Sequence, residues 1–212
     1  MITKPDPAKI WVSDLNSAPE VRQPFAGRSP VRFYDATLRD GEQTVGVVLS
    51  PQQKLEIARA LDGMGVARIE AGFPRVSAED AEAITLIQGA GLKAEVWGFS
   101  RAVPADLDEL VRLGVRYSVI EAPTSEIKLR AYGIKPEEIL NRVTAAVRHA
   151  TQAGIYVAYF AVDGTRTELA FLKQVYLRAM DAGAKEIVVV DTIGACGPEA
   201  GQPPAMPAWH VS

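Results

Sequence analysis

The sequence predicts an α/β fold of the (β/α)8 or TIM barrel type, with about six of the eight β/α units present. Three observations support this prediction. Short apolar segments alternate with longer amphipathic segments along most of the 212-residue chain. The repeat is roughly thirty residues long, the length of a strand–helix unit that brings the next strand parallel to the last. Polar or charged residues follow most of the apolar segments, and in a barrel these strand ends meet on one face.

Runs rich in β-branched and aromatic residues predict the strands, and apolar residues three and four positions apart predict the helices. Strands are expected at residues 31–38, 66–72, 94–99, 115–121, 155–162 and 185–191. Helices are expected at residues 51–63, 78–89, 105–113, 136–152 and 167–181. Ser50 with Pro51, and Ser77 with Asp80, predict helix starts, the second of them as a capping box. Glycines of the kind that end helices are Gly65, Gly91, Gly114, Gly154 and Gly183.

A doubly wound open sheet is the alternative architecture. Such a sheet normally has a G-x-G-x-x-G turn after its first strand, whereas residues 39–43 read R-D-G-E-Q. We therefore favour the barrel. A complete barrel takes about 250 residues and eight strands, so six strands would leave two unpaired edges.

We expect three segments: an irregular arm at residues 1–30, the partial barrel at residues 31–200 and an irregular, proline-rich tail at residues 201–212. The net charge of −3 gives no indication of nucleic acid or an anionic membrane as a partner. The single cysteine, Cys196, is expected to be a small packing residue in a reducing compartment. No apolar run could span a bilayer and no signal peptide is evident, so we expect a cytoplasmic protein.

The first predicted strand ends with two oppositely charged residues, Arg39 and Asp40, directly before Gly41. A glycine lets the backbone turn sharply or approach a ligand closely. A carboxylate can hold a cation and a guanidinium can bind an anionic oxygen, so the pair suits a binding or catalytic site. An ordinary ion pair at a strand end is the alternative interpretation.

This stretch resembles the first signature of the isopropylmalate, homocitrate and citramalate synthases. The signature reads L-R-D-G-E-Q at residues 38–43, followed after ten residues by Lys54. Similarity continues at residues 69–74, 163–166 and 191–194. These synthases belong to a larger group of metal-dependent barrel lyases that includes hydroxymethylglutaryl-CoA lyase, and the resemblance implies a barrel that stops after its sixth strand.

The resemblance implies a Claisen-type condensation of acetyl-CoA with a 2-oxo acid. It puts Asp40 on a divalent metal (Mg²⁺, Mn²⁺ or Zn²⁺) and Arg39 where it would polarise the keto acid or stabilise a developing enolate or alkoxide. Gln43 would line the same pocket, and Thr192 would place a hydroxyl on the keto-acid carboxylate. Glu70 could bind substrate from the second strand, with a structural carboxylate paired to an arginine as the alternative. We expect a homodimer for the full-length enzyme.

Two departures bear on this expectation. The family completes its metal site with a His-x-His pair on strand seven, whereas this chain has only His149, in a predicted helix, and His210, in the tail. In strand five, Val162 replaces a family glutamate, and Ala158 and Phe160 make the same wall apolar. The second departure implies a more hydrophobic keto acid or another reaction of the group.

Three hypotheses stay open: an acyltransferase, a carbon–carbon lyase or aldolase of the same group, and a non-catalytic fragment or partner-completed module. The long connection at residues 122–135 follows Glu121 and is predicted to be a binding loop or lid. Its Lys128 and Arg130 could contact a phosphate of CoA, with a solvated loop as the alternative. Asp163 is expected to orient its turn through Thr165 and Arg166 rather than to catalyse.

Overall fold

The computed structural model describes residues 32–194 and residue 196, and all but the first of these belong to one structural unit. The predicted arm and tail, with His210, lie outside the described residues. In the part of the chain that is described, no helix combines the length and the hydropathy that a membrane span requires.

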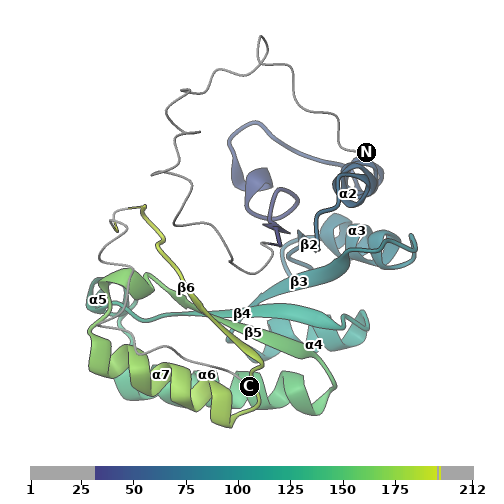
Figure 1. Cartoon of the computed structure of the whole chain (residues 1–212). Coiled ribbons are helices and arrows are strands. Elements are labelled where there is room, and N and C mark those ends of the chain that lie inside the picture. The colour runs from purple at the N-terminus through teal and green to yellow at the C-terminus, as the bar shows by residue number, and fades with distance from the viewer. Residues whose placement is uncertain (1–31, 195, 197–212) are drawn as a thin grey trace, which may run out of the picture. The chain divides into compact units, whose positions relative to one another are not determined.

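Six parallel strands form one sheet in the order in which they follow each other along the chain (Figure 1). Their bounds are Tyr34–Asp35 (β1), Arg68–Gly72 (β2), Glu95–Arg101 (β3), Tyr117–Pro123 (β4), Tyr156–Val162 (β5) and Glu186–Val189 (β6). A doubly wound sheet reverses its strand order at a switch point, and this sheet does not. The prediction of a barrel-type fold with about six units is confirmed.

Helices follow the strands at nearly the predicted positions. Their bounds are Pro51–Gly63 (α2), Ala78–Gln88 (α3), Pro104–Arg112 (α4), Glu126–Tyr132 (α5), Pro136–Gln152 (α6) and Leu169–Asp181 (α7), and Gly41–Gln43 (η4) and Gly164–Arg166 (η5) are 3-10 turns. The prediction of an irregular loop before α6 is wrong at α5. Ser125 caps this helix by accepting from the Lys128 amide, and Gly133 ends it in the left-handed conformation.

The predicted helix caps are confirmed at one start and corrected at the other. Ser50 and Gln53 form a reciprocal capping box at the start of α2. At α3 the Ser77 hydroxyl accepts from the Asp80 amide at 3.0 Å, but the Asp80 carboxylate does not return to Ser77. It binds the Phe73 amide and the Lys54 ammonium instead, so no capping box forms there. All five glycines predicted to end helices have positive φ.

The strand β1 is much shorter than the sequence predicts. Only Tyr34 and Asp35 pair with β2, at Arg68 and Ile69. The backbone amides of Arg39, Asp40 and Gly41 then all donate to the carbonyl oxygen of Ala36, at N···O distances of 2.8–3.2 Å. This tight turn ends the strand early and brings the R-D-G-E-Q segment to the edge of the sheet.

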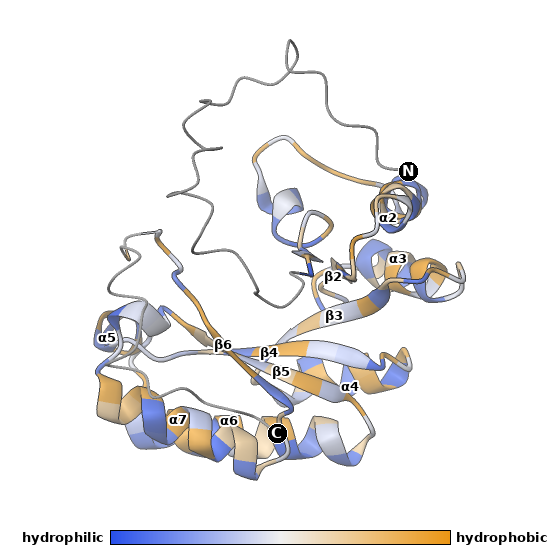
Figure 2. Ribbon diagram, viewed as in Figure 1, coloured by the Kyte–Doolittle hydropathy of each residue, from blue (hydrophilic) through white to orange (hydrophobic). Residues whose placement is uncertain are grey.

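The two faces of the sheet bury different side chains. One face packs beneath the helices, and its partners include the fully buried α6 stripe of Ile139, Val143, Ala146, Val147 and Ala150. The opposite face carries an aromatic cluster built on Trp97, Phe99, Val119 and Ala158. In Figure 2, α6 and α7 alternate between blue and orange turns, as expected for helices with one buried stripe.

An ion pair across the aromatic face shows that the sheet curls. Arg68 at the start of β2 donates two hydrogen bonds, of 2.8 and 2.7 Å, to the carboxylate of Glu186 at the start of β6. It also pairs with Glu95 at 2.9 Å and lies over the Trp97 ring. Strands that are four positions apart face each other across an eight-stranded barrel. The contact between β2 and β6 therefore indicates that the sheet curves as it would in such a barrel.

The packing of β3 against α4 leaves no room for a side chain at Gly98. A Cβ there would lie 2.8 Å from Leu110 Cδ2 and 3.2 Å from Val115 Cγ1. We expect Gly98→Ala to lower the free energy of unfolding by about 1–3 kcal/mol through overpacking, measured by urea denaturation. Gly63→Ala is the control, because its Cβ would meet nothing within 4 Å and a helical alanine should add about 0.4–1 kcal/mol. Equal effects of the two changes would contradict the prediction.

Candidate active site

The predicted site residues all lie at the carboxyl edge of the sheet or just beyond it. Arg39, Asp40 and Gln43 follow β1, Glu70 lies in β2, and Thr192 follows β6. Glu121, which precedes the long connection, lies near the end of β4. In a parallel sheet these ends share one edge, which is the active face in barrels. The structure then separates the residues that touch each other from those that do not.

Arg39 and Glu70 form the central contact of the site. The Arg39 Nε donates to Glu70 Oε1 at 2.5 Å, and Nη2 lies 3.4 Å from Oε2. The Glu70 side chain is 1% exposed and that of Arg39 is 14% exposed. The guanidinium carbon also lies 4.2 Å from the centre of the Phe99 ring. Arg39 is therefore held in one place by a buried carboxylate and an aromatic face.

Glu70 is thus paired to an arginine, as the alternative interpretation of this residue predicts. Arg68 and Arg75 are nearer in the sequence, but the contact is made by Arg39 from the neighbouring strand end. Burial raises the pKa of the Glu70 carboxyl, and the hydrogen bonds from Arg39 oppose that rise. Burial beside Glu70 also raises the pKa of the Tyr34 phenol.

Asp40 is the most accessible acidic group of the R-D-G-E-Q segment. Its Oδ1 accepts a hydrogen bond from Arg39 Nη1 at 2.8 Å, and its side chain is 66% exposed. Gln43, in η4, is also exposed. The guanidinium of Arg39 therefore bridges a buried carboxylate and an exposed one. This arrangement fixes the arginine while leaving one carboxylate at the surface.

The R-D-G-E-Q segment is also held by a buried lysine that was not predicted as a site residue. Lys54 in α2 is 1% exposed, and its ammonium forms ion pairs with Glu42 and Asp80. The same ammonium donates to the Leu38 carbonyl at 3.2 Å. The available signal was the fixed spacing of Lys54 after the L-R-D-G-E-Q signature. Its role is to tie the turn after β1 to α2 and α3.

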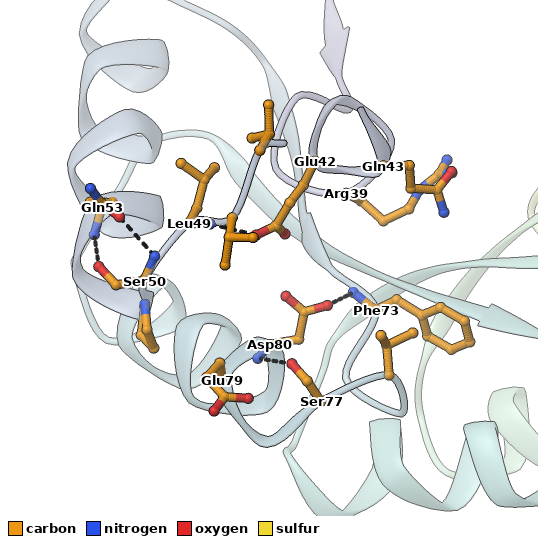
Figure 3. Close-up of a pocket in the computed structure, with 14 residues that line it drawn as sticks. Arg39, Glu42, Gln43, Leu49, Ser50, Gln53, Phe73, Ser77, Glu79 and Asp80 are labelled. Carbon is orange, nitrogen blue, oxygen red and sulfur yellow. Dashed lines mark hydrogen bonds between the residues drawn. The ribbon is translucent and has the colours of Figure 1, made fainter. Parts of the chain in front are cut away.

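A groove with a volume of about 660 Å³ is lined by Glu42 and Asp80, the two acidic partners of this lysine. In Figure 3 the carboxylates of Glu42 and Asp80 point toward each other across it. Arg39 and Gln43 line the groove, whereas Asp40, Glu70 and Thr192 do not. The groove therefore lies on the helix side of the segment and is not one continuous pocket with all the predicted site residues.

A second cavity, of about 420 Å³, opens at the ends of β3, β4 and β5. Its lining includes Glu121, Val162, Lys128 and Arg101, but not Arg130. Of the two basic residues that could contact a CoA phosphate, Lys128 thus faces a cavity and Arg130 is exposed elsewhere. Arg101 is already paired with Asp106 through two hydrogen bonds to its carboxylate.

The carboxyl of Glu121, which lines this cavity, should make the stability of the protein depend on pH. Burial raises its pKa, with Arg39 opposing the rise. A carboxyl whose pKa is higher in the folded state makes the protein less stable as pH rises through the ordinary carboxyl range. Glu121→Gln should therefore raise the melting temperature at pH 7 by a few degrees, at about 2–4 °C per kcal/mol, and leave it unchanged at pH 4. A lower melting temperature at pH 7 would contradict the prediction.

Thr192 lies beyond β6, where it contacts the turn after β5. Its Oγ1 accepts a hydrogen bond from the Asp163 amide at 2.8 Å. As expected, Asp163 orients its turn through Arg166, which donates to both carboxylate oxygens at 2.7 Å. Thr165 was expected to take part, but its hydroxyl donates to Asp191 instead.

Asp40, which the resemblance puts on a divalent metal, has an exposed carboxylate. No group of three or more His, Cys, Asp or Glu side chains in residues 32–194 and 196 is placed to hold a metal ion. His149 Nε2 lies 3.0 Å from Asp108 on the surface, as a packing or surface histidine would. One carboxylate does not make a closed zinc site. It does fit an ion such as Mg²⁺, which uses one or two carboxylates and completes its shell with water and substrate oxygens.

Comparison with known proteins identifies the family. The family model described as HMGL-like matches residues 30–202. The chain belongs to this family. Homocitrate synthase AksA of Methanothermobacter thermautotrophicus is 38% identical over 192 residues, which cover 90% of this chain and 48% of that protein. The 2-isopropylmalate synthase of Methanocaldococcus jannaschii is 44% identical over 172 residues, which cover 80% of this chain and 33% of that protein.

The fold is also similar to that of a solved structure. The HMG-CoA lyase of Bacillus subtilis superposes with a TM-score of 0.68 and 17% sequence identity over 80% of this chain and 61% of that chain. This likeness concerns the barrel fold. The HMGL-like chain spans about half the length or less of the two synthases compared above.

Proposed function

We propose that this HMGL-like chain contributes to an enzyme that condenses acetyl-CoA with a 2-oxo acid. The observation that carries the proposal is the Arg39 guanidinium, held by buried Glu70 and set beside exposed Asp40 at the barrel's active edge. Sequence identities of 38% and 44% to a homocitrate synthase and a 2-isopropylmalate synthase support it. We assign Arg39, Gln43 and Thr192 to substrate binding, Glu70 to holding Arg39 in place, and Asp40 to the metal.

The reaction explains why an anchored arginine is useful. The enolate of acetyl-CoA adds to the keto carbon, a carbon–carbon bond forms, and the former keto oxygen becomes an alkoxide. Water then cleaves the thioester and CoA leaves. An N–H donor fixed beside the keto oxygen stabilises the negative charge as it develops, without first having to reorganise. Arg39 is such a donor, because Glu70 and Phe99 hold its position.

Asp40 would hold a divalent ion together with the carboxylate and keto oxygens of the 2-oxo acid and water. The ion would supply Lewis acidity toward the carbonyl when bound.

The strand-five wall bears on the identity of the keto acid. Ala158 is buried in the aromatic cluster on the sheet face opposite the helices, and Phe160 packs against that cluster. Val162 follows it at the mouth of the second cavity. A keto acid with a second carboxylate would need a cation against this wall, and burying that charge against apolar residues is unfavourable. We therefore propose a 2-oxo acid with an apolar side chain.

Val162 also supports one alternative. A glutamate that helps the synthases bind or activate substrate is absent at this position, which leaves carbon–carbon cleavage by a lyase or aldolase as the second candidate. Release of a ketone or aldehyde product from a 3-hydroxy-3-methylacyl-CoA or a 4-hydroxy-2-oxo acid, with no condensation, would favour it. A third candidate, a module completed by a partner, is supported by the two open edges, β1 and β6, of the described sheet.

Calorimetric titration of the 212-residue chain tests the proposal. We expect Mn²⁺ or Mg²⁺ to bind more tightly in the presence of an apolar 2-oxo acid, because the acid completes the ion's shell. Asp40→Asn should weaken that ternary binding by at least about tenfold, since it removes the charged oxygen ligand. Glu56→Gln, on an exposed face of α2, is the matched control and should bind as wild type does. Equal binding by Asp40→Asn would contradict the assignment of Asp40.

A further inference from the structure

The turn after β5 contains a residue in an unusual backbone conformation. Asp163 has φ 65° and ψ 32° and is the one non-glycine residue with positive φ among those the structure describes. The left-handed conformation costs an L-residue about 1–2 kcal/mol. Such a residue persists where its surroundings hold it in place, and this kind of strain concentrates at functional sites.

Side chains from two loops hold Asp163 in this conformation. Its side chain is 0% exposed, and Ser125 from the β4 loop donates to Oδ2 at 2.5 Å. Arg166 donates to both carboxylate oxygens at 2.7 Å, and Thr167 donates to the Asp163 carbonyl at 3.0 Å. Hydrogen bonds from Arg166 lower the pKa of the Asp163 carboxyl, so it is ionised at neutral pH. A third hydroxyl, that of Thr124, lies 2.7 Å from Thr167.

The consequence of this backbone conformation is the direction of one amide. The Asp163 N–H donates to Thr192 Oγ1 at 2.8 Å. A threonine hydroxyl has one hydrogen and two lone pairs. Once Oγ1 accepts from the amide, its hydrogen points elsewhere and can donate. Thr192 is exposed at the active edge, so it presents a hydrogen-bond donor there.

We propose that Asp163 is a positioning residue: its left-handed amide, held by Ser125 and Arg166, fixes the Thr192 hydroxyl as a donor to the substrate carboxylate. The positioning follows from the contacts above, whereas the ligand rests on the proposed function. Asp163 would act through Thr192 and touch no reacting atom. The loops after β4, β5 and β6 would then move as one unit, because Asp163 connects all three.

Amide hydrogen exchange measured by NMR tests the positioning without any ligand. Thr192→Val should speed the exchange of the Asp163 amide by up to about tenfold, because its hydrogen-bond acceptor is lost. Thr192→Ser keeps the acceptor and should retain slow exchange. Ser125→Ala removes one support and should also speed exchange. Thr144→Val, within α6, is the control and should leave the Asp163 amide unchanged. Equal exchange in Thr192→Val and wild type would overturn the proposal.

Titration of an apolar 2-oxo acid in the presence of Mn²⁺ tests the link to substrate. Thr192→Val should weaken binding by about 10- to 100-fold, the value of a hydrogen bond to a charged group, and Thr192→Ser should restore most of it. Asp163→Gly, which adopts the left-handed conformation without strain, should weaken binding by a smaller factor. If Asp163→Gly only lowered stability and left the affinity of the folded protein unchanged, Asp163 would be structural and the proposal would be wrong.

The two measurements separate the proposals from each other. Faster exchange in Thr192→Val, with no binding of the acid by wild type, would keep the positioning role and overturn the proposed function. Binding by wild type that Thr192→Val does not weaken would overturn the substrate role of Thr192 and with it the positioning of a donor for substrate.

Discussion

Replacing Lys54 by methionine is expected to lower the free energy of unfolding by about 3–5 kcal/mol, because the change leaves two partly buried carboxylates without their cation. The Lys54 side chain is 1% exposed and pairs with both Glu42 and Asp80. Methionine keeps the unbranched apolar stem, so the effect reports the lost charge more than lost packing. Denaturation by urea at pH 7 measures it. Lys173→Met, at an exposed position of α7, should change stability by less than about 0.5 kcal/mol.

The same prediction can be tested by removing the carboxylates as well. Adding Glu42→Gln and Asp80→Asn to Lys54→Met should restore part of the lost stability, because no partly buried charge is then left unpaired. If the single change cost no more than Lys173→Met, Lys54 would not be the residue that holds the turn after β1. Lys54 also donates to the carbonyl of Leu38, directly before Arg39. Losing Lys54 should therefore also affect catalysis by the proposed enzyme.

The elements predicted most accurately are those with strong local signals. The bounds of α2 and α6 match the prediction because each begins with a proline at its first turn and carries a clear apolar stripe. The seven-residue α5 was missed because it is too short to show helical periodicity. The strand β1 was predicted too long because the amides that end it bind the Ala36 carbonyl, and a main-chain turn of this kind leaves little trace in composition.

The residues of the candidate site also divide into those with a local sequence signal and those whose contacts depend on tertiary packing. Arg39 and Asp40 are neighbours in sequence, and they form the ion pair that the alternative interpretation of this strand end predicts. The partner of Glu70 could not be predicted, because it depends on the register in which β1 pairs with β2. The contact between Lys54 and Asp80 joins two different helices, and that between Asp163 and Thr192 joins two loops. Both depend on tertiary packing, which residue spacing does not encode. The assignments of Arg39, Gln43, Glu70 and Thr192 to substrate, and of Asp40 to a metal, stay predictions.

Breaking the pair between Arg39 and Glu70 is the second change with a large expected effect. Glu70→Gln should lower the free energy of unfolding by about 3–5 kcal/mol, because the guanidinium of Arg39, 14% exposed, loses its carboxylate. Arg39→Met should cost a similar amount, because it leaves Glu70 charged and buried. The double variant Arg39→Met/Glu70→Gln should cost less than the sum by about 0.5–3 kcal/mol, the coupling of residues in contact.

An exposed pair within α6 gives the control for this cycle. Glu138 and Arg142 form an ion pair one helical turn apart with about half of each side chain exposed. Their coupling in the same double-mutant cycle should be about 0.3–0.5 kcal/mol. Equal couplings for the two pairs would show that Glu70 does not anchor Arg39 more strongly than a surface contact anchors its partner.

The pH dependence of Arg39→Met distinguishes an anchored arginine from a merely nearby one. Burial already raises the pKa of Glu70, and Arg39 is the main group that opposes the rise. Without Arg39 the pKa should rise further, so the folded state binds a proton more readily than the unfolded state. The destabilisation should then be present at pH 7 and shrink as pH falls through the raised pKa toward the ordinary carboxyl range. A loss of stability that is the same at pH 4 and pH 7 would mean that Glu70 does not depend on Arg39. Arg39 would then lack the fixed position that charge stabilisation in the proposed condensation requires.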